Sequence, residues 1–372
     1  MSDEFPESDR RDGAPHPRET DLLFGHAQAE TTFLDAYNSG RLPHAWLLTG
    51  PEGAGKASFA WRAARFLLAT EPPGDDMFGG PPPPTSLDIS PDHPVAHRLL
   101  ALSEPGLCLL RRPWDEKAKR LKTQLTVDEV RQLKSFFSMS AGGNGRRVVI
   151  VDSADEMNTS AANALLKELE EPPKDAVLFL ISHRPSGLLP TIRSRCRTLR
   201  FSGLSAGDLT QALTQAGQTP PDNADALTEL AQGSVGEAVR LMQNDGLGLY
   251  ADLTKLIGSL PRLDRAIALK LAEATGGKAT DRFDLTLSLL DTLLTRLART
   301  GATGQTPPEI APGEAQILAR LSPDPHRARA WADLAATLTA KARRGRAVNL
   351  DPATLVFDMF LEMDRMAAAL PA

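Results

Sequence analysis

Hydrophobic residues in the first half of the chain fall into short runs, whereas those in the second half follow helical spacing. Five short, mainly apolar segments stand out, at residues 45–49, 107–110, 148–151, 177–181 and 198–201. Runs of this length are typical of strands in a buried sheet. Helix-spaced segments, such as residues 56–69, lie between them. Strands that alternate with helices predict a parallel sheet with helices on both faces.

Beyond residue 201 the pattern is helical only. Residues 205–216 and 224–244 have helical spacing, with an interruption at Gly233-Ser234. Four or five further helical stretches follow residue 246, and the last begins at Asp351-Pro352, an N-cap followed by proline at the first helical position. The pattern therefore predicts an α/β domain at 21–202, a small helical lid at 203–246 and an all-α C-terminal domain at 247–372.

Two segments show no element pattern. Residues 1–20 are polar and charged and lack the apolar stretch of a secretory signal, so they are predicted to form a disordered N-terminal tail. Residues 71–94 are rich in proline and glycine, which indicates a loop inserted into the α/β domain.

Composition narrows the function classes. The net charge of −5 does not mark a general nucleic-acid binder. The two cysteines, Cys108 and Cys196, exclude a disulfide framework and fit a reducing cytoplasm. No stretch is apolar over the length that a membrane span needs.

A phosphate-loop motif follows the first predicted strand. Residues 50–56 fit G-x-x-x-x-G-K, in which Gly50, Gly53 and Gly55 allow backbone N–H groups to surround phosphate oxygens and Lys56 reaches the terminal phosphates. The motif then requires Ser or Thr as a Mg²⁺ ligand, but Ala57 stands there. Two interpretations remain open: a degenerate site that binds ATP weakly without hydrolysis, or a glycine-rich turn that binds nothing.

Two further blocks make the motif specific. The first is Asn-Ala-Leu-Leu-Lys-Glu-Leu-Glu-Glu-Pro-Pro at 163–173, and the second is Ser-Arg-Cys-Arg at 194–197. In this order behind a phosphate loop, they resemble the clamp-loader family of AAA+ proteins. The resemblance covers most of residues 21–245. It implies that the α/β domain is an AAA+ P-loop domain and that the C-terminal helices are the collar that holds clamp-loader subunits in a ring.

The resemblance also assigns roles to single residues. Asp152 ends a predicted strand where P-loop ATPases place the carboxylate that holds Mg²⁺. Ser153 stands where active members place a water-activating glutamate, and Gly236 where they place a lid arginine. Asp155 and Glu156 are the other candidates for the missing base. Arg195 is assigned to the ATP site of an adjacent subunit, where an arginine finger stabilises charge on the transferred phosphoryl group. The alternative is a solvated basic patch of Arg193, Arg195 and Arg197.

The resemblance implies a stator subunit of the replicative clamp loader, without intrinsic enzymatic activity, within the DNA polymerase III holoenzyme. The implied partners are gamma/tau and delta subunits in a hetero-oligomeric ring, the sliding clamp, and primed DNA reached through the assembly; no membrane is involved. The expected location is the cytoplasm. An ATP-hydrolysing motor subunit is the first alternative, and a P-loop nucleotide kinase is the second.

Metal ligands are sparse in the sequence. Many members of the family carry a four-cysteine zinc module behind the P-loop helix, where this chain has the insertion at 71–94. Cys108, His93 and His97 form a loose set that is weak evidence for a site. We therefore predict no bound metal and no structural zinc.

Overall fold

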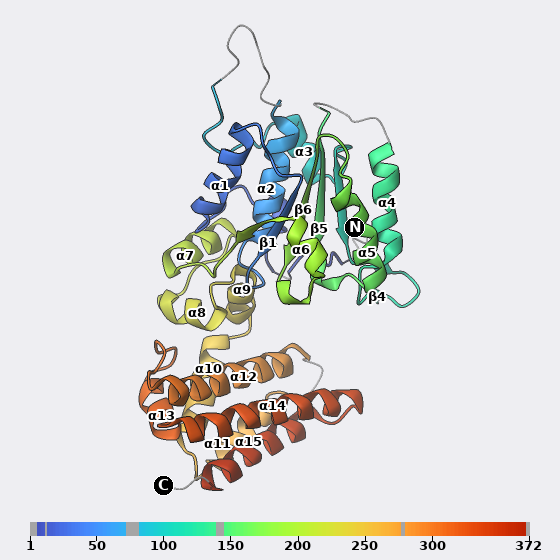
Figure 1. Ribbon diagram of the computed structural model, residues 1–372. Coiled ribbons are helices and arrows are strands. Elements are labelled where there is room, and N and C mark those ends of the chain that lie inside the picture. Colours follow the sequence, from blue (N-terminus) through green and yellow to red (C-terminus); the bar gives the residue numbers. More distant parts are fainter. Residues whose placement is uncertain (1–5, 12, 72–81, 139–144, 277–279, 370–372) are drawn as a thin grey trace. The chain divides into compact units, whose positions relative to one another are not determined.

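The computed structural model describes residues 6–11, 13–71, 82–138, 145–276 and 280–369, and these fall into two compact units (Figure 1). Unit 1 comprises residues 1–220 and 232–239, and unit 2 comprises residues 221–231 and 240–372. Residues 72–81 of the predicted insertion lie outside the described residues. The domain boundaries inferred from sequence stay predictions.

Unit 1 is built on a five-stranded parallel sheet of order β2-β5-β6-β1-β7. The five segments predicted as strands all occur in it. Their bounds are β1 Ala45–Thr49, β2 Leu107–Arg111, β5 Arg147–Asp152, β6 Ala176–Ser182 and β7 Arg197–Arg200. A separate hairpin pairs β3 Trp114–Asp115 with β4 Arg120–Leu121.

Helices cover both faces of the sheet, as predicted (Figure 1). Successive strand residues point to opposite faces, so Trp46 and Leu48 of β1 pack with α1, α2 and α3, while Ala45 and Leu47 pack with α4, α5 and α6. The helices and 3-10 turns of unit 1 are η1 Pro17–Glu19, α1 Ala27–Asn38, α2 Lys56–Ala69, α3 Pro94–Leu100, α4 Val127–Ser138, η2 Ala154–Glu156, α5 Thr159–Glu170, η3 Pro185–Gly187, α6 Pro190–Arg195 and α7 Ala206–Gln215.

The elements of unit 2 in its described residues are all helices. It contains α8 Ala224–Ala231, α10 Gly246–Gly258, α11 Arg265–Glu273, α12 Thr280–Thr303, α13 Glu314–Leu321, α14 Pro325–Ala347 and α15 Pro352–Ala369. Helix α9, Val235–Gln243, runs from unit 1 into unit 2. Asp351 caps α15 as predicted, since its carboxylate accepts a hydrogen bond of 2.8 Å from the Thr354 N–H. None of the described helices is both long and apolar enough to cross a membrane.

Unit 2 encloses a charged pair that the sequence pattern did not indicate. Glu314 is fully buried and accepts hydrogen bonds from Arg296 Nε at 2.7 Å and Tyr250 Oη at 2.6 Å. The Ile310 N–H donates to the other carboxylate oxygen at 2.7 Å. Burial beside Glu314 raises the pKa of Tyr250, so its hydroxyl remains a donor. These partners join α10, α12 and the start of α13.

The N-terminal segment, defined here as residues 6–11 and 13–20, is ordered. It contains η1 and the fully buried His16, whose Nδ1 accepts a hydrogen bond of 3.0 Å from the Arg18 N–H. The expectation of a disordered tail is therefore wrong for these residues, while residues 1–5 and 12 lie outside the described part. The reason is that its charged side chains pair with each other and with the body of unit 1 instead of being solvated.

Candidate phosphate-loop site and exposed arginine

The phosphate loop connects β1 to α2, as its motif predicts. Gly50, Gly53 and Gly55 all have positive φ, at 148°, 75° and 88°. Lys56, the first residue of α2, is only 2% exposed, and its Nζ donates to the carbonyl oxygens of Gly50, at 2.8 Å, and Pro51. Burial lowers the pKa of Lys56 to about 8, against the attraction of nearby carboxylates. The ammonium group that would bind phosphate thus donates its hydrogen bonds to backbone carbonyls of the loop.

The glycines of the loop also make room for protein. A Cβ at Gly53 would lie 1.9 Å from the Ser234 Oγ, and one at Gly50 would lie 2.1 Å from the Phe201 carbonyl oxygen. Ser234 immediately precedes α9, and the Val235 N–H donates to the Gly53 carbonyl at 3.4 Å. Close packing against the protein therefore explains why glycine is needed at these two positions, without a bound nucleotide.

Asp152 ends β5 beside the loop, where the sequence placed it. Burial raises the pKa of Asp152 to about 7, with further contributions in the same direction from Asp9 and Glu156, while Lys56 opposes them. The next residue, Ser153, is 4% exposed. A serine hydroxyl has no basicity at neutral pH, so this position cannot activate water.

The two alternative bases are committed to other contacts. Asp155 accepts hydrogen bonds from the Ser182 hydroxyl at 2.7 Å and from the backbone N–H groups of His183 and Arg184. Glu156 accepts a hydrogen bond of 2.7 Å from Arg112 Nε. Asp155 therefore fixes the end of β6, and Glu156 fixes an arginine. Neither replaces the missing glutamate in this arrangement.

A cavity of about 550 Å³ lies against the loop within unit 1. Its lining includes Lys56, Ala57, Asp152 and Gly236, which the sequence assigned to a nucleotide site. The N-terminal segment supplies another part of the lining, through Ser8, Asp9, Arg10, Arg11, Ala14, Pro15, Pro17 and Thr20. The sequence did not indicate this contribution, because a polar segment without periodicity carries no local signal of where it docks.

His26 is a second residue of this region that the sequence pattern missed. It is 6% exposed, its Nε2 lies 2.6 Å from the Ala54 carbonyl oxygen in the loop, and its ring packs against Phe201. Burial lowers the pKa of His26, which favours the neutral ring. Its position just before α1 lets it support the loop's backbone.

The lid position holds glycine, and another part of the chain supplies a cation there. A Cβ at Gly236 would lie 3.1 Å from the Arg11 Cγ. Arg11 forms an ion pair with Glu52 of the loop. Arg240, one helical turn beyond Gly236, falls in unit 2. The nearest arginine to the lid position within unit 1 therefore comes from the N-terminal segment.

The residues around the cavity do not fit a catalytic Mg²⁺–ATP complex. Ala57 offers no hydroxyl to a cation, and Lys56 already donates to two loop carbonyls. Gly50, Gly53 and Gly55 keep the positive φ values that such a loop uses. The loop is therefore retained without the groups that turnover requires.

Arg195 is the last residue of α6, at the surface of unit 1. It lies at a helix end, directly before Cys196 and β7. Its side chain is 36% exposed and forms an ion pair of 2.8 Å with Glu170, and its Nη1 donates to the Thr191 carbonyl at 3.0 Å. Glu170 is the last residue of α5, within the Leu-Glu-Glu-Pro-Pro block. The two sequence blocks at 163–173 and 194–197 thus meet through this pair.

The flanking residues differ from Arg195 in their surroundings. The Arg197 guanidinium stacks over the Trp46 ring at 5.2 Å, while Arg193 is exposed on α6. Cys196 is partly buried, and burial raises its pKa to about 12, so its thiol is unreactive at neutral pH. The three arginines therefore do not form a uniform patch.

No group of three or more His, Cys, Asp or Glu side chains suited to a metal is found among the described residues. His93 caps α3, where its Nδ1 accepts a hydrogen bond of 3.2 Å from the Val95 N–H. Burial raises the pKa of Cys108, on β2, to about 11, which disfavours the thiolate that zinc requires.

We accordingly expect purified protein to contain clearly substoichiometric zinc. The physical reason is that neither thiol is poised to ionise and that His93 already serves as a helix cap. Elemental analysis after dialysis measures this, with a zinc-finger protein as the positive control. Stoichiometric zinc that survives dialysis would contradict the prediction.

A parallel sheet covered by helices, with a phosphate loop after β1 and an aspartate at the end of β5, defines a P-loop protein of the AAA+ class. Within it, the profile of the family described as "DNA polymerase III, delta subunit" matches residues 25–205. Over that region the chain is similar to this family, and relatives at 33–35% identity are named subunit delta'.

Three relatives show the extent of the similarity. The chain is 35% identical over 233 residues to DNA polymerase III subunit delta' of Pseudomonas aeruginosa (62% of this chain, 65% of that protein). It is 34% identical over 212 residues to subunit delta' of Bacillus subtilis (56% and 57%). It is 28% identical over 281 residues to subunit gamma/tau of Mycobacterium tuberculosis (67% and 44%). Each match spans less than two thirds of the relative's own length.

Proposed function

We propose that this chain is a delta-prime-type stator subunit of a replicative clamp loader. In this role it organises a ring of ATPase subunits that places the sliding clamp on primed DNA. The observation that carries the proposal is Arg195, which is exposed at a helix end. The chain's own site has Ala57, Ser153 and Gly236 at the positions of the Mg²⁺ ligand, the catalytic base and the lid arginine. The similarity to proteins named delta' supports the same assignment.

In the proposed mechanism Arg195 acts on the ATP site of a neighbouring subunit. Its guanidinium is held by Glu170 and by the Thr191 carbonyl in the isolated chain, while the side chain stays partly exposed to solvent. A phosphate group competes well with a partly exposed carboxylate, because an arginine–phosphate contact is charge-assisted and often bidentate. Once exchanged, Arg195 stabilises the negative charge that develops on the transferred phosphoryl group.

The chain's own site is proposed to be silent. Three parts of phosphoryl transfer are missing from three separate segments: the Mg²⁺ hydroxyl at Ala57, the water-activating carboxylate at Ser153 and the lid arginine at Gly236. Weak binding of ATP without hydrolysis remains compatible with the loop. The absence of intrinsic activity is therefore part of the proposal.

The partners follow from the proposed role. They are gamma/tau and delta subunits, with the helices of unit 2 as the collar that joins the ring, and through the assembly the sliding clamp and primed DNA. The role implies a cytoplasmic location. Affinity purification of the tagged chain from its own cells is expected to recover the other loader subunits. Recovery of the chain alone at endogenous expression, with an authentic loader subunit purified in parallel as the control, would refute this function.

An ATP-hydrolysing motor subunit is the second candidate, since the chain also matches a protein named gamma/tau over 281 residues. The two candidates differ in what Lys56 does. In a motor it binds the terminal phosphates, whereas in a stator it only stabilises the loop through the carbonyls of Gly50 and Pro51.

We expect Lys56→Met to leave the clamp-loading activity of the reconstituted complex close to that of the wild type, because no turnover depends on the ammonium group. Methionine retains the buried stem and removes the charge. Phosphate release by the isolated chain is expected to stay at background with either residue. The equivalent lysine substitution in a motor subunit is the control and should abolish loading. Mg²⁺-dependent hydrolysis that disappears in Lys56→Met would establish the motor instead.

A further inference from the structure

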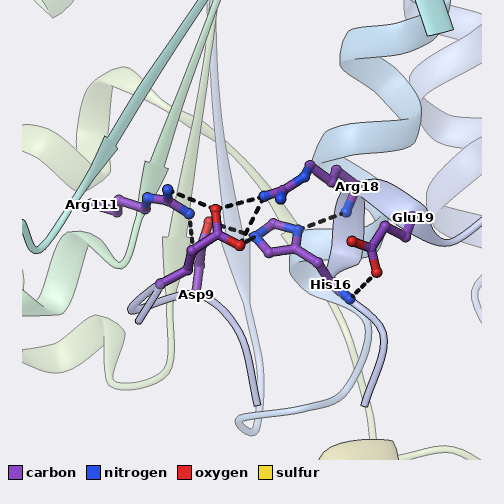
Figure 2. Close-up of polar contacts among 6 residues, drawn as sticks. Asp9, His16, Arg18, Glu19 and Arg111 are labelled. Atoms are coloured by element: carbon purple, nitrogen blue, oxygen red, sulfur yellow. Dashed lines mark hydrogen bonds and ion pairs between the residues drawn. The ribbon is translucent and has the colours of Figure 1, made fainter. Parts of the chain in front are cut away.

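The N-terminal segment carries its own network of charges (Figure 2). Glu7 accepts hydrogen bonds from Arg18 Nη1 at 2.8 and 3.1 Å. Asp9 lies between Arg111 and His16, with its Oδ2 3.2 Å from His16 Nε2 and its other oxygen paired with Arg111. The side chains of Asp9 and His16 are both fully buried. Buried charges are stable only when paired, so this segment has one preferred arrangement.

The segment is also fastened to the body of unit 1 at several points. Arg111, at the carboxyl end of β2, holds both Asp9 and Glu7, the latter at 2.8 Å. Arg65 of α2 donates to the Arg18 carbonyl at 2.9 Å, and the His16 ring packs edge-on against Trp61 at 5.8 Å. These contacts connect the segment to the helix that follows the phosphate loop.

From these anchors the segment reaches the loop itself. Arg11 forms its ion pair with Glu52, and its aliphatic stem fills the space left by the missing side chain at Gly236. Asp9 is close enough to Asp152 to raise its pKa. The segment therefore brings a carboxylate toward the end of β5, where a polyphosphate would require positive charge.

We propose that the N-terminal segment is an intramolecular cover that docks on the phosphate loop and keeps nucleoside polyphosphates out until it is released. The cavity of about 550 Å³ lies between the loop and this cover, since both line it. The cover forms one side of the cavity, it places the Asp9 carboxylate near Asp152, and its Arg11 is already paired with Glu52. This device goes beyond the stator function and does not depend on it.

The test measures access to the loop without requiring that nucleotide bind. A cysteine introduced by Ala57→Cys lines the cavity, and its labelling by a negatively charged thiol reagent is followed by mass spectrometry of its peptide. The labelling rate of the Ala57→Cys chain, the parent, is compared with that of the same chain carrying Glu7→Gln and Asp9→Asn, which remove the anchoring charges. Labelling of residue 57 is expected to rise about tenfold or more, because losing a charge-assisted hydrogen bond shifts a docking equilibrium by at least that order.

A matched control carries Glu116→Gln and Asp92→Asn, two exposed carboxylates outside the cavity lining, and should label at the parent rate. Labelling of Cys108 reports unfolding of the chain. If labelling of Cys108 rises together with that of residue 57, the Arg11→Gln variant is tested instead, and labelling of residue 57 must rise in it as well. Arg11 is 57% exposed, so its replacement leaves the buried network intact. Equal labelling of residue 57 in parent and released chains would overturn the proposal.

A fluorescent ATP analogue is expected to bind more tightly to the released chain, and unchanged binding alongside unchanged labelling would confirm that the segment is no cover.

Discussion

Replacement of Arg195 by alanine is expected to lower the DNA- and clamp-stimulated ATPase activity of the reconstituted loader by about 10³–10⁵-fold at the site that it contacts. The physical reason is loss of the positive charge that offsets charge on the transferred phosphoryl group. Assembly is expected to be unchanged, because Arg195 is exposed and its polar contacts among the described residues are with Glu170 and the Thr191 carbonyl of its own helix. Steady-state phosphate release at saturating ATP measures the effect, with size-exclusion chromatography to verify assembly.

Arg193→Ala is the matched control, since it removes an exposed arginine from the same helix, two residues away. It is expected to retain activity close to that of the wild type. Glu170→Gln removes the carboxylate that competes for Arg195 and is expected to retain activity as well. Unchanged turnover in Arg195→Ala would refute the trans assignment, whereas an equal loss in Arg193→Ala would indicate a general charge effect.

Glu314→Ala is expected to destabilise unit 2 by about 3–5 kcal/mol, because it leaves the buried Arg296 charge and the Tyr250 hydroxyl without their acceptor. Hydrogen exchange in peptides from α10, α12 and α13 measures the change as a loss of protection. The pair joins these helices, so the loss should extend across them and should spare β1, β5 and β6 of unit 1.

Asp252→Ala provides the control for this variant. Asp252 is a carboxylate of α10 that is 55% exposed and lies 3.8 Å from Lys255, so its removal is expected to change the stability of unit 2 by less than about 0.5 kcal/mol. A Glu314→Ala chain with wild-type protection in all three helices would show that the buried pair contributes little to the fold.

Local sequence patterns predicted the five strands of the parallel sheet well, but not the short hairpin of β3 and β4. A strand buried on both faces needs an apolar residue at nearly every position, and this requirement is visible within a few residues of sequence. Capping signals are equally local. Thr126 and Glu129 match a capping box, and in the structure the Glu129 carboxylate accepts a 2.7 Å hydrogen bond from the Thr126 N–H.

The candidate site was only partly accessible to sequence. The spacing of Gly50, Gly53, Gly55 and Lys56 located the loop, but it did not reveal that Lys56 would donate to the loop's own carbonyls. That choice depends on the space around the ammonium group, which segments distant in the chain determine. Likewise, the positive charge at Arg195 was visible, while its pairing with Glu170 required α5 and α6 to be placed side by side.

The sequence by itself determined the elements, the parallel α/β class, the phosphate loop and the blocks that mark the family, because each is encoded in residues close together along the chain. Only the tertiary structure decided the order of the strands, the burial of Glu314 with Arg296, and the docking of the N-terminal segment. In each of these cases charged or apolar groups far apart in sequence satisfy one another. Charges such as Asp9 and Arg111, which lie 102 residues apart, carry no local mark of their partner, so their pairing emerges only when the fold removes them from water.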